Sequence, residues 1–149
     1  MAHEAVPRAV RRQVRDRAGD RCEYCRHPAS YSCAPFVCEH VLPRVLGAGS
    51  TAEELAWACP ACNGHKYDKT RSRDPQTGRI VPLFNPRRQR WSRHFAWDAE
   101  FLHVEGRTAT GRATVTALHL NSPALVNLRR ALRAIGEHPP TGPRFPGYS

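Results

Sequence analysis

Four cysteines of the chain stand in two pairs, each with two residues between its members. The pairs are Cys22 with Cys25 and Cys59 with Cys62. A turn with this spacing directs both sulfurs of a pair at one ion, and four thiolates complete the tetrahedral shell of a structural zinc. A catalytic zinc is disfavoured, because four thiolates leave no position open for a substrate. The spacing therefore predicts a structural Zn²⁺ site.

Two further cysteines, Cys33 and Cys38, lie between the pairs without sharing their spacing. Isolated cysteines commonly behave as small buried hydrophobic residues or as free thiols. The first residues are polar and charged, and no apolar run reaches the length of a membrane span. We therefore expect a cytoplasmic protein without membrane segments, whose cysteines bind metal or remain thiols rather than form disulfides.

A second group of candidate residues consists of Glu39, His40 and Asn63. Glu39 and His40 lie between the two cysteine pairs, and Asn63 directly follows Cys62. If one zinc ion joins the two pairs, these three residues must lie close together. Carboxylate and amide oxygens are hard ligands suited to Mg²⁺, which takes one or two protein oxygens and completes its shell with water and phosphate. Glu39 and Asn63 are therefore candidate ligands of a second metal ion.

The elements that must position these residues follow in the order strand, loop, strand, helix. The cluster Phe36 to Cys38 predicts a short strand, and Leu55 to Ala58 predicts a second. Gly47 to Ser50 marks the loop between them. Proline is favoured at the first position of a helix, so Cys59 followed by Pro60 predicts a helix from Pro60 to about Thr70. We expect an α+β fold.

The flanking segments differ in composition. We expect one domain over residues 1–136, with a basic first helix at Pro7 to Ala18 and a C-terminal strand and helix extension over residues 94–136. In that extension we predict two strands on either side of a turn at residues 98–100, a helix at residues 112–120, and a last helix capped by Ser122. Residues 71–93 form an arginine-rich arm predicted to lack regular structure, and residues 137–149 are expected to be a flexible tail.

The runs CEYC, EHVLP and LAWACPACNGHK resemble the HNH endonuclease family, whose paired cysteines frame a ββα-metal core. The resemblance covers about residues 21–70, and later runs resemble a bacterial subfamily of small HNH proteins. It implies metal-dependent hydrolysis of phosphodiester bonds in DNA. In the implied roles, Glu39 and Asn63 hold a catalytic Mg²⁺ or Mn²⁺, and His40 activates water.

One position departs from the family pattern. Glu54 stands where the family has its middle asparagine, which braces the loop that orients the histidine. A carboxylate accepts hydrogen bonds but offers no amide donors. Activity is then reduced, or the loop is held differently. Two other interpretations are that Glu54 approaches the metal ion or that it is a solvent-exposed surface residue.

The helix after the second cysteine pair carries two further candidates. Positions 63 and 65 are about 200° apart on a helix, whereas Lys66 lies one turn from Asn63. We therefore predict Lys66 as a phosphate contact and keep His65 as an alternative metal ligand.

The chain carries a formal charge of +10, which suits a polyanionic partner such as DNA. Within the arm, the predicted nucleic-acid contacts are Arg87, Arg88, Arg90 and Arg93, with a solvated linker as the alternative. A non-cleaving, zinc-stabilised nucleic-acid-binding module is the competing function. The sequence leaves the oligomeric state open.

Overall fold

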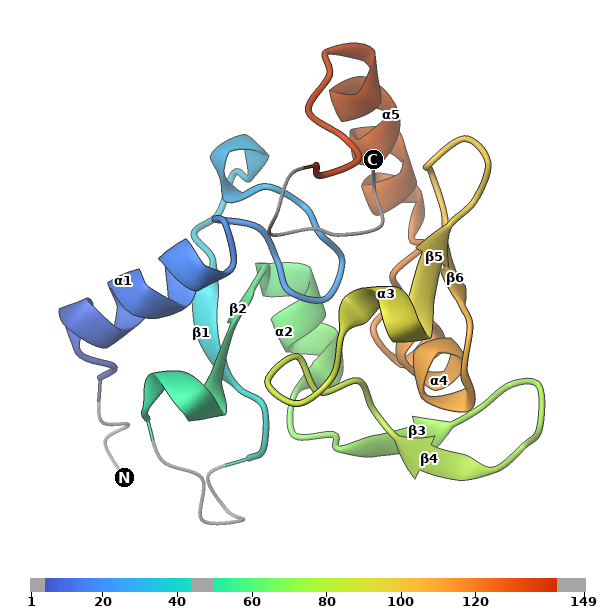
Figure 1. Ribbon diagram of the computed structural model, residues 1–149, viewed down its shortest axis with the longest axis horizontal. Coiled ribbons are helices and arrows are strands. Elements are labelled where there is room, and N and C mark those ends of the chain that lie inside the picture. Colours follow the sequence, from blue (N-terminus) through green and yellow to red (C-terminus); the bar gives the residue numbers. More distant parts are fainter. Residues whose placement is uncertain (1–4, 44–49, 142–149) are drawn as a thin grey trace.

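The computed structural model describes residues 5–43 and 50–141. The predicted α+β class is confirmed, because short helices alternate with three two-stranded antiparallel sheets (Figure 1). The predicted loop at residues 47–50 falls largely outside the described residues. In chain order the elements are α1 (Arg8–Arg17), η1 (Ala29–Tyr31), β1 (Val37–His40), η3 (Ala52–Glu54), β2 (Leu55–Ala58), α2 (Pro60–Lys66), β3 (Arg71–Arg73), β4 (Ile80–Pro82), α3 (Trp91–His94), β5 (Phe95–Trp97), β6 (Val104–Gly106), α4 (Ala109–Ala117) and α5 (Pro123–Ala134).

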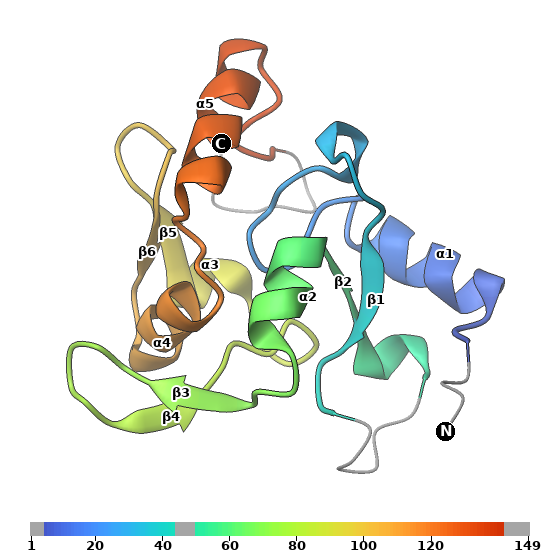
Figure 2. The same ribbon diagram turned by 180° about the vertical axis from the view of Figure 1, so that it is seen from behind.

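Strands β1 and β2 form an antiparallel hairpin beside α2, as both ribbon views show (Figures 1 and 2). The hairpin pairs Val37 with Ala58 and His40 with Leu55. Every residue of β2 is buried, so this strand lies in the interior. The predicted second strand is confirmed, and the first extends to His40.

Helix α2 begins at Pro60 as predicted, and the sulfur of Cys59 caps it by accepting a hydrogen bond from the backbone N–H of Cys62 at 3.4 Å. It ends at Lys66 rather than near Thr70. The reason is Tyr67, whose φ of 50° lies in the left-handed region and cannot continue a right-handed helix. The helix therefore makes about two turns, and Cys62, Asn63 and Lys66 all lie within them.

The predicted elements at both ends of the chain are confirmed with shifted bounds. Helix α1 begins one residue later than expected, and α5 begins at Pro123 with Ser122 as its cap. Helix α4 begins at Ala109 rather than Arg112, because the side chain of Thr108 caps it by accepting from the Gly111 N–H at 3.0 Å. One cluster of buried apolar side chains reaches from Val14 in α1 to Leu125 in α5.

The prediction that residues 71–93 lack regular structure was wrong. Strands β3 and β4 form a hairpin within this arm. Asp74 organises the turn, because its carboxylate accepts from the backbone N–H of Gln76 and of Thr77 at 3.1 and 3.3 Å. Arg112 of α4 binds the same carboxylate through two nitrogens, each at 2.9 Å. Turn chemistry and one bidentate ion pair thus order the arm.

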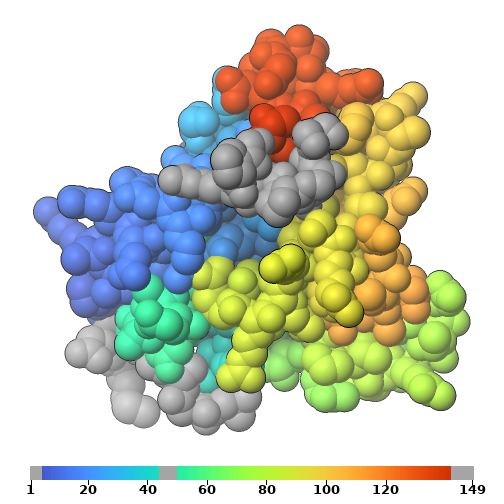
Figure 3. Space-filling model, viewed as in Figure 1, coloured from blue at the N-terminus to red at the C-terminus, as the bar shows by residue number. Residues whose placement is uncertain are grey.

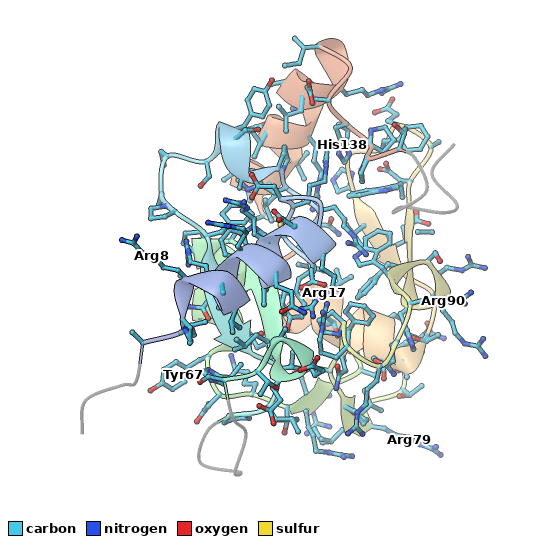
Figure 4. All side chains as sticks on the ribbon, turned by 60° about the vertical axis from the view of Figure 1, so that its left-hand side comes forward. Arg8, Arg17, Tyr67, Arg79, Arg90 and His138 are labelled. Carbon is cyan, nitrogen blue, oxygen red and sulfur yellow. The ribbon has the colours of Figure 1, made fainter. Side chains whose placement is uncertain are left out.

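The first residues of the predicted flexible tail pack against the fold. His138 is 5% exposed, and its ring bonds the carbonyl oxygen of Phe101 at 2.7 Å and packs edge-on against Trp97. Figure 4 shows His138 pointing between α5 and the β5–β6 hairpin. Burial lowers the pKa of this imidazole to about 4. Residues 142–149 of the predicted tail lie outside the described residues.

Among the helices of residues 5–43 and 50–141, none combines the length and the apolar character needed to cross a lipid bilayer.

The Asp74–Arg112 ion pair predicts how the hairpin responds to acid. The guanidinium of Arg112 holds the pKa of Asp74 well below its usual range. A carboxyl group with a lowered pKa stabilises the folded state above its unfolded pKa of about 3.9, and this contribution is lost as the pH falls below that value. We therefore expect Asp74→Asn to lower the melting temperature at pH 7, and the difference from wild type to shrink below about pH 4.

The exposed Asp68, which precedes the hairpin, provides the control. Asp68→Asn should leave the melting temperature close to the wild-type value throughout. Equal melting curves for Asp74→Asn and wild type at pH 7 would contradict the role given to Asp74.

Candidate metal centre and adjoining residues

The four paired cysteines meet in the interior of the protein. The sulfurs of Cys22, Cys25, Cys59 and Cys62 all lie within 4.8 Å of one another, and all four residues are buried. The sulfurs of Cys25 and Cys59 are 3.7 Å apart. A tetrahedron with Zn–S bonds of about 2.3 Å has edges of about 3.8 Å. The spacing of this pair therefore fits two ligands of one tetrahedral ion.

The electrostatics of the cluster also favour a cation. Burial raises the pKa of the Cys22 thiol well above its usual value, and hydrogen bonds that the Cys62 thiol donates to neighbouring sulfurs raise the pKa of Cys62. Hydrogen bonds from Cys22, Cys25 and Cys62 lower the pKa of Cys59. One thiolate is thus favoured at the expense of its neighbours, and a divalent ion would allow all four to ionise. The donor set fits a zinc ion.

The two remaining cysteines stay outside this cluster. Both are free thiols; Cys33 is exposed, and Cys38 is half-buried in β1. The interpretation as free thiols is confirmed, whereas burial as a small hydrophobic residue does not hold for Cys33.

Glu39 lies between the β1–β2 hairpin and α2, where it is 4% exposed. One carboxylate oxygen accepts a hydrogen bond from the Tyr24 hydroxyl at 2.7 Å. The other oxygen forms an ion pair with the ammonium of Lys66, which is itself buried. Burial raises the pKa of Glu39, and the charge of Lys66 opposes this rise. A positive charge already neutralises the carboxylate in this structure.

Lys66, predicted as a phosphate contact, makes its own contacts inside the fold. Its ammonium binds Glu39 and donates to the carbonyl oxygens of His40 and Val41 at 3.2 and 2.9 Å. With 1% of the residue exposed, Lys66 acts from the interior and ties α2 to the end of β1. The spacing of residues along α2 placed Lys66 on the same helix face as Asn63, but it could not reveal that the ammonium binds a buried carboxylate and two carbonyl oxygens.

His40, at the end of β1, is half-buried. Its Nε2 lies 3.4 Å from the hydroxyl oxygen of Ser50. Successive side chains of a strand point to opposite faces, so His40 and Glu39 leave the hairpin on different sides at its end. His40 is thus nearer to solvent than its neighbour.

Asn63 and His65 take different positions around α2. Asn63 is half-buried and lies one turn from Lys66, on the helix side that faces Glu39. His65 is exposed, and its ring packs against that of His119 with 4.2 Å between centroids. In the part of the chain that the structure describes, the four cysteines are the one group of three or more possible ligands placed to hold an ion. His65 is therefore not part of such a group.

Glu54 braces the loop that precedes β2. Its carboxylate accepts from the backbone N–H and the hydroxyl of Thr51 at 3.4 and 3.2 Å, which forms a capping box on η3. Its carbonyl oxygen accepts from the Val41 N–H at 3.1 Å, next to His40. Glu54 is half-buried rather than a free surface residue. Of the interpretations above, the different way of holding the loop fits these contacts.

The predicted arginine contacts divide into two groups. Arg87 forms an ion pair with the buried Glu23, and burial lowers the pKa of its guanidinium to about 10. Arg87 therefore holds the arm against the first cysteine pair instead of facing a ligand. Arg88, Arg90 and Arg93 are exposed.

Two residues of this region were missed by sequence reasoning. Tyr24 binds Glu39, and Glu23 binds both Arg87 and the backbone N–H of Trp57, the latter at 2.8 Å. These two residues lie between Cys22 and Cys25. The sequence could have indicated them, because two polar residues inside a zinc-binding turn are buried when the turn closes on the ion.

A cavity of about 340 Å³ lies next to Lys66 and the residues that follow β1. Lys66 lies on its wall, together with Arg71, Asn85 and Arg88. Val41 and Leu42, which directly follow His40, also line it. The cavity therefore joins the end of β1 to two basic side chains of the arm.

Comparison with known proteins matches one segment of the chain to a family model. Residues 22–69 match the family model described as HNH endonuclease. No curated protein and no solved structure matched the chain significantly. The matched segment runs from the first cysteine past the end of α2 and includes all four clustered cysteines. This segment therefore resembles an HNH endonuclease domain, and the match suggests a nuclease or a nucleic-acid-related function.

The cysteine cluster predicts a metal content of one zinc ion per chain. We expect Cys59→Ser to lose that ion and to unfold at a markedly lower temperature, because binding free energy at such a site is folding free energy. Elemental analysis and circular dichroism measure both effects.

The exposed Cys33 provides a matched control, since Cys33→Ser removes a thiol outside the cluster. This variant should keep its zinc and its wild-type melting temperature. Wild-type protein that folds but contains no zinc after expression in zinc-supplemented medium would contradict the assignment.

Proposed function

We propose that the protein is a metal-dependent endonuclease that hydrolyses phosphodiester bonds in DNA. The observation that carries the proposal is the convergence of β1 and α2 within the HNH segment. Glu39 and His40 end one element, and Asn63 lies on the facing side of the other. In this proposal the hairpin and α2 form a ββα-metal core, for which the cysteine cluster supplies the zinc-bound support.

His40 acts as the general base. An ordinary imidazole has a pKa of about 6.5 and can therefore take a proton from water at neutral pH. As the O–H bond of water breaks toward His40, the water oxygen forms a bond to phosphorus. The bond from phosphorus to the leaving oxygen then breaks. Lys66 and Glu54 both hold the peptide group that follows this imidazole, Lys66 through the carbonyl of His40 and Glu54 through the N–H of Val41.

Glu39 and Asn63 are the residues that would hold the divalent ion, Mg²⁺ or Mn²⁺. When bound, such an ion supplies positive charge next to the scissile phosphate and the leaving oxygen. The hard oxygen donors fit it, and Glu39 already neutralises one cation, the ammonium of Lys66. We infer that the ion and the ammonium compete for the same carboxylate. Arg71 and Arg88, on the wall of the adjoining cavity, would contact flanking phosphates.

The second candidate function is a nucleic-acid-binding module that does not cut. The Glu39–Lys66 ion pair favours it, because a carboxylate that keeps its lysine cannot ligate a metal ion fully. Glu54 at the middle asparagine position points the same way. Binding to DNA without metal-dependent cleavage would support this candidate over the first.

The nuclease proposal predicts the effect of removing the base. His40→Ala should reduce Mg²⁺-dependent nicking of supercoiled plasmid by about 10²- to 10⁴-fold, the usual contribution of a general base. Gel electrophoresis of a time course measures the rate. The exposed His103, which pairs with Asp98 in the β5–β6 hairpin, gives the control His103→Ala.

Wild-type protein that binds plasmid without nicking it would reject the proposal. Nicking that His40→Ala leaves at the wild-type rate would reject the role of His40.

The competition for Glu39 gives a separate prediction. Lys66→Met should destabilise the metal-free protein by about 3–5 kcal/mol, because it leaves a buried carboxylate without its ion-pair partner. Mn²⁺ should restore part of this loss and raise the melting temperature of the variant more than that of wild type.

The control is Lys69→Met, since Lys69 is exposed and its ammonium donates to the carbonyl oxygen of His65 at 2.8 Å. Its stability should match wild type at every Mn²⁺ concentration. An equal Mn²⁺ response in all three proteins would argue against a shared site for the ion and the ammonium.

A further inference from the structure

A groove runs between α1, which precedes the segment matched by the family model, and the part of that segment that leads into β1. Its volume is about 540 Å³. Arg8, Arg11, Arg12 and Arg15 line one side, and the buried rings of Phe36 and Trp57 line its interior. None of the residues that line the groove in the described part of the chain is acidic. The groove therefore presents a row of positive charge over an apolar base.

The four arginines share one face of α1. Their positions follow the pattern i, i+3, i+4, i+7, which places side chains in a stripe along a helix. Seven residues of helix rise by about 10 Å. One strand of duplex DNA carries a phosphate about every 3.4 Å along its axis, so the stripe spans about three phosphates. Its length and regularity fit a backbone of repeated anions.

The row is held partly in place. Arg11 donates to the carbonyl oxygen of Phe36 at 2.9 Å, and its guanidinium lies 4.7 Å from the centre of the Trp57 ring. Arg8 and Arg12 are exposed, as Arg11 is. Arg8 points away from the body of the protein in Figure 4, and Figure 3 shows α1 along one edge of the molecule. A ligand can reach these two side chains without rearrangement of the fold.

Helix α1 is also bonded to the hairpin that carries the proposed centre. Arg17 donates to the carbonyl oxygens of Ala52 and Leu55, both at 2.8 Å, and Leu55 is the β2 residue opposite His40. Arg11 bonds Phe36, the residue before β1. A polymer bound along α1 is therefore held in a fixed position relative to His40.

We propose that the α1 groove binds the sugar–phosphate backbone of DNA to one side of the cutting centre. Guanidinium groups form paired hydrogen bonds with phosphate oxygens, and such contacts position a duplex without reading its sequence. DNA is chosen over an acidic peptide because the stripe matches a regular phosphate repeat. The choice of polymer rests on the proposed function.

Salt dependence of binding tests this inference. Arg8→Gln combined with Arg12→Gln removes two exposed charges of the stripe. The matched control combines Arg130→Gln with Arg133→Gln, two exposed arginines three residues apart on α5. Binding of each protein to a fluorescent DNA duplex is measured by anisotropy over a NaCl series, without added divalent ion.

The logarithm of the binding constant should fall with the logarithm of salt concentration less steeply for the α1 variant, by about 1.8, because each phosphate contact contributes about 0.9 to the slope. The control should keep a slope close to wild type. Equal slopes for all three proteins, or equal reductions in both variants, would overturn the inference.

Parallel assays separate this outcome from the function itself. Wild type that binds through α1 but does not nick plasmid would refute the nuclease and leave the groove assignment intact. Nicking by wild type with an unchanged slope in the α1 variant would refute the groove assignment alone. Stronger α1-dependent binding to poly-glutamate or to an RNA duplex than to DNA would also overturn it.

Discussion

The meeting of four buried thiols is the constraint on which the rest of the structure depends. Cys22 and Cys25 come from a turn after α1, whereas Cys59 and Cys62 begin α2, and their sulfurs lie within 4.8 Å of one another. A chain of 149 residues buries a modest core, so a zinc ion that joined these two distant segments would contribute strongly to its stability. It would also set the position of α2 against the hairpin.

A second layer of buried charge is built on that support. Tyr24 and Glu23, inside the first cysteine turn, bind Glu39 and Arg87. Lys66 of α2 completes the group by pairing with Glu39. Each of these charges is expensive to bury alone, and each has an opposite partner. The result is a region in which the hairpin, α2 and the arginine-rich arm are joined through side chains rather than through one continuous sheet.

The positive charge of the protein is consequently divided by role. Arg17, Arg87 and Arg112 bind carbonyl oxygens or carboxylates within the fold. Arg88, Arg90 and Arg93 of the arm remain exposed, as do Arg8 and Arg12 of α1. The two exposed groups lie in segments that are each bonded to the HNH segment, the arm through Glu23 and α1 through Leu55. Net charge alone therefore overstates the surface available to a polyanion.

Local patterns in the sequence determined the cysteine ligands, the hairpin strands and the helix starts at Pro60 and Pro123, because spacing, capping and β-propensity act over a few neighbouring residues. The proposed centre at Glu39 and His40 likewise rests on adjacent residues and on the family resemblance they carry. Only the tertiary structure decided that Lys66 faces a buried carboxylate, that Arg87 is held by Glu23, and that Asp74 orders the arm through Arg112. These are pairings between residues 27 to 64 positions apart, and their energies depend on burial that no short pattern encodes.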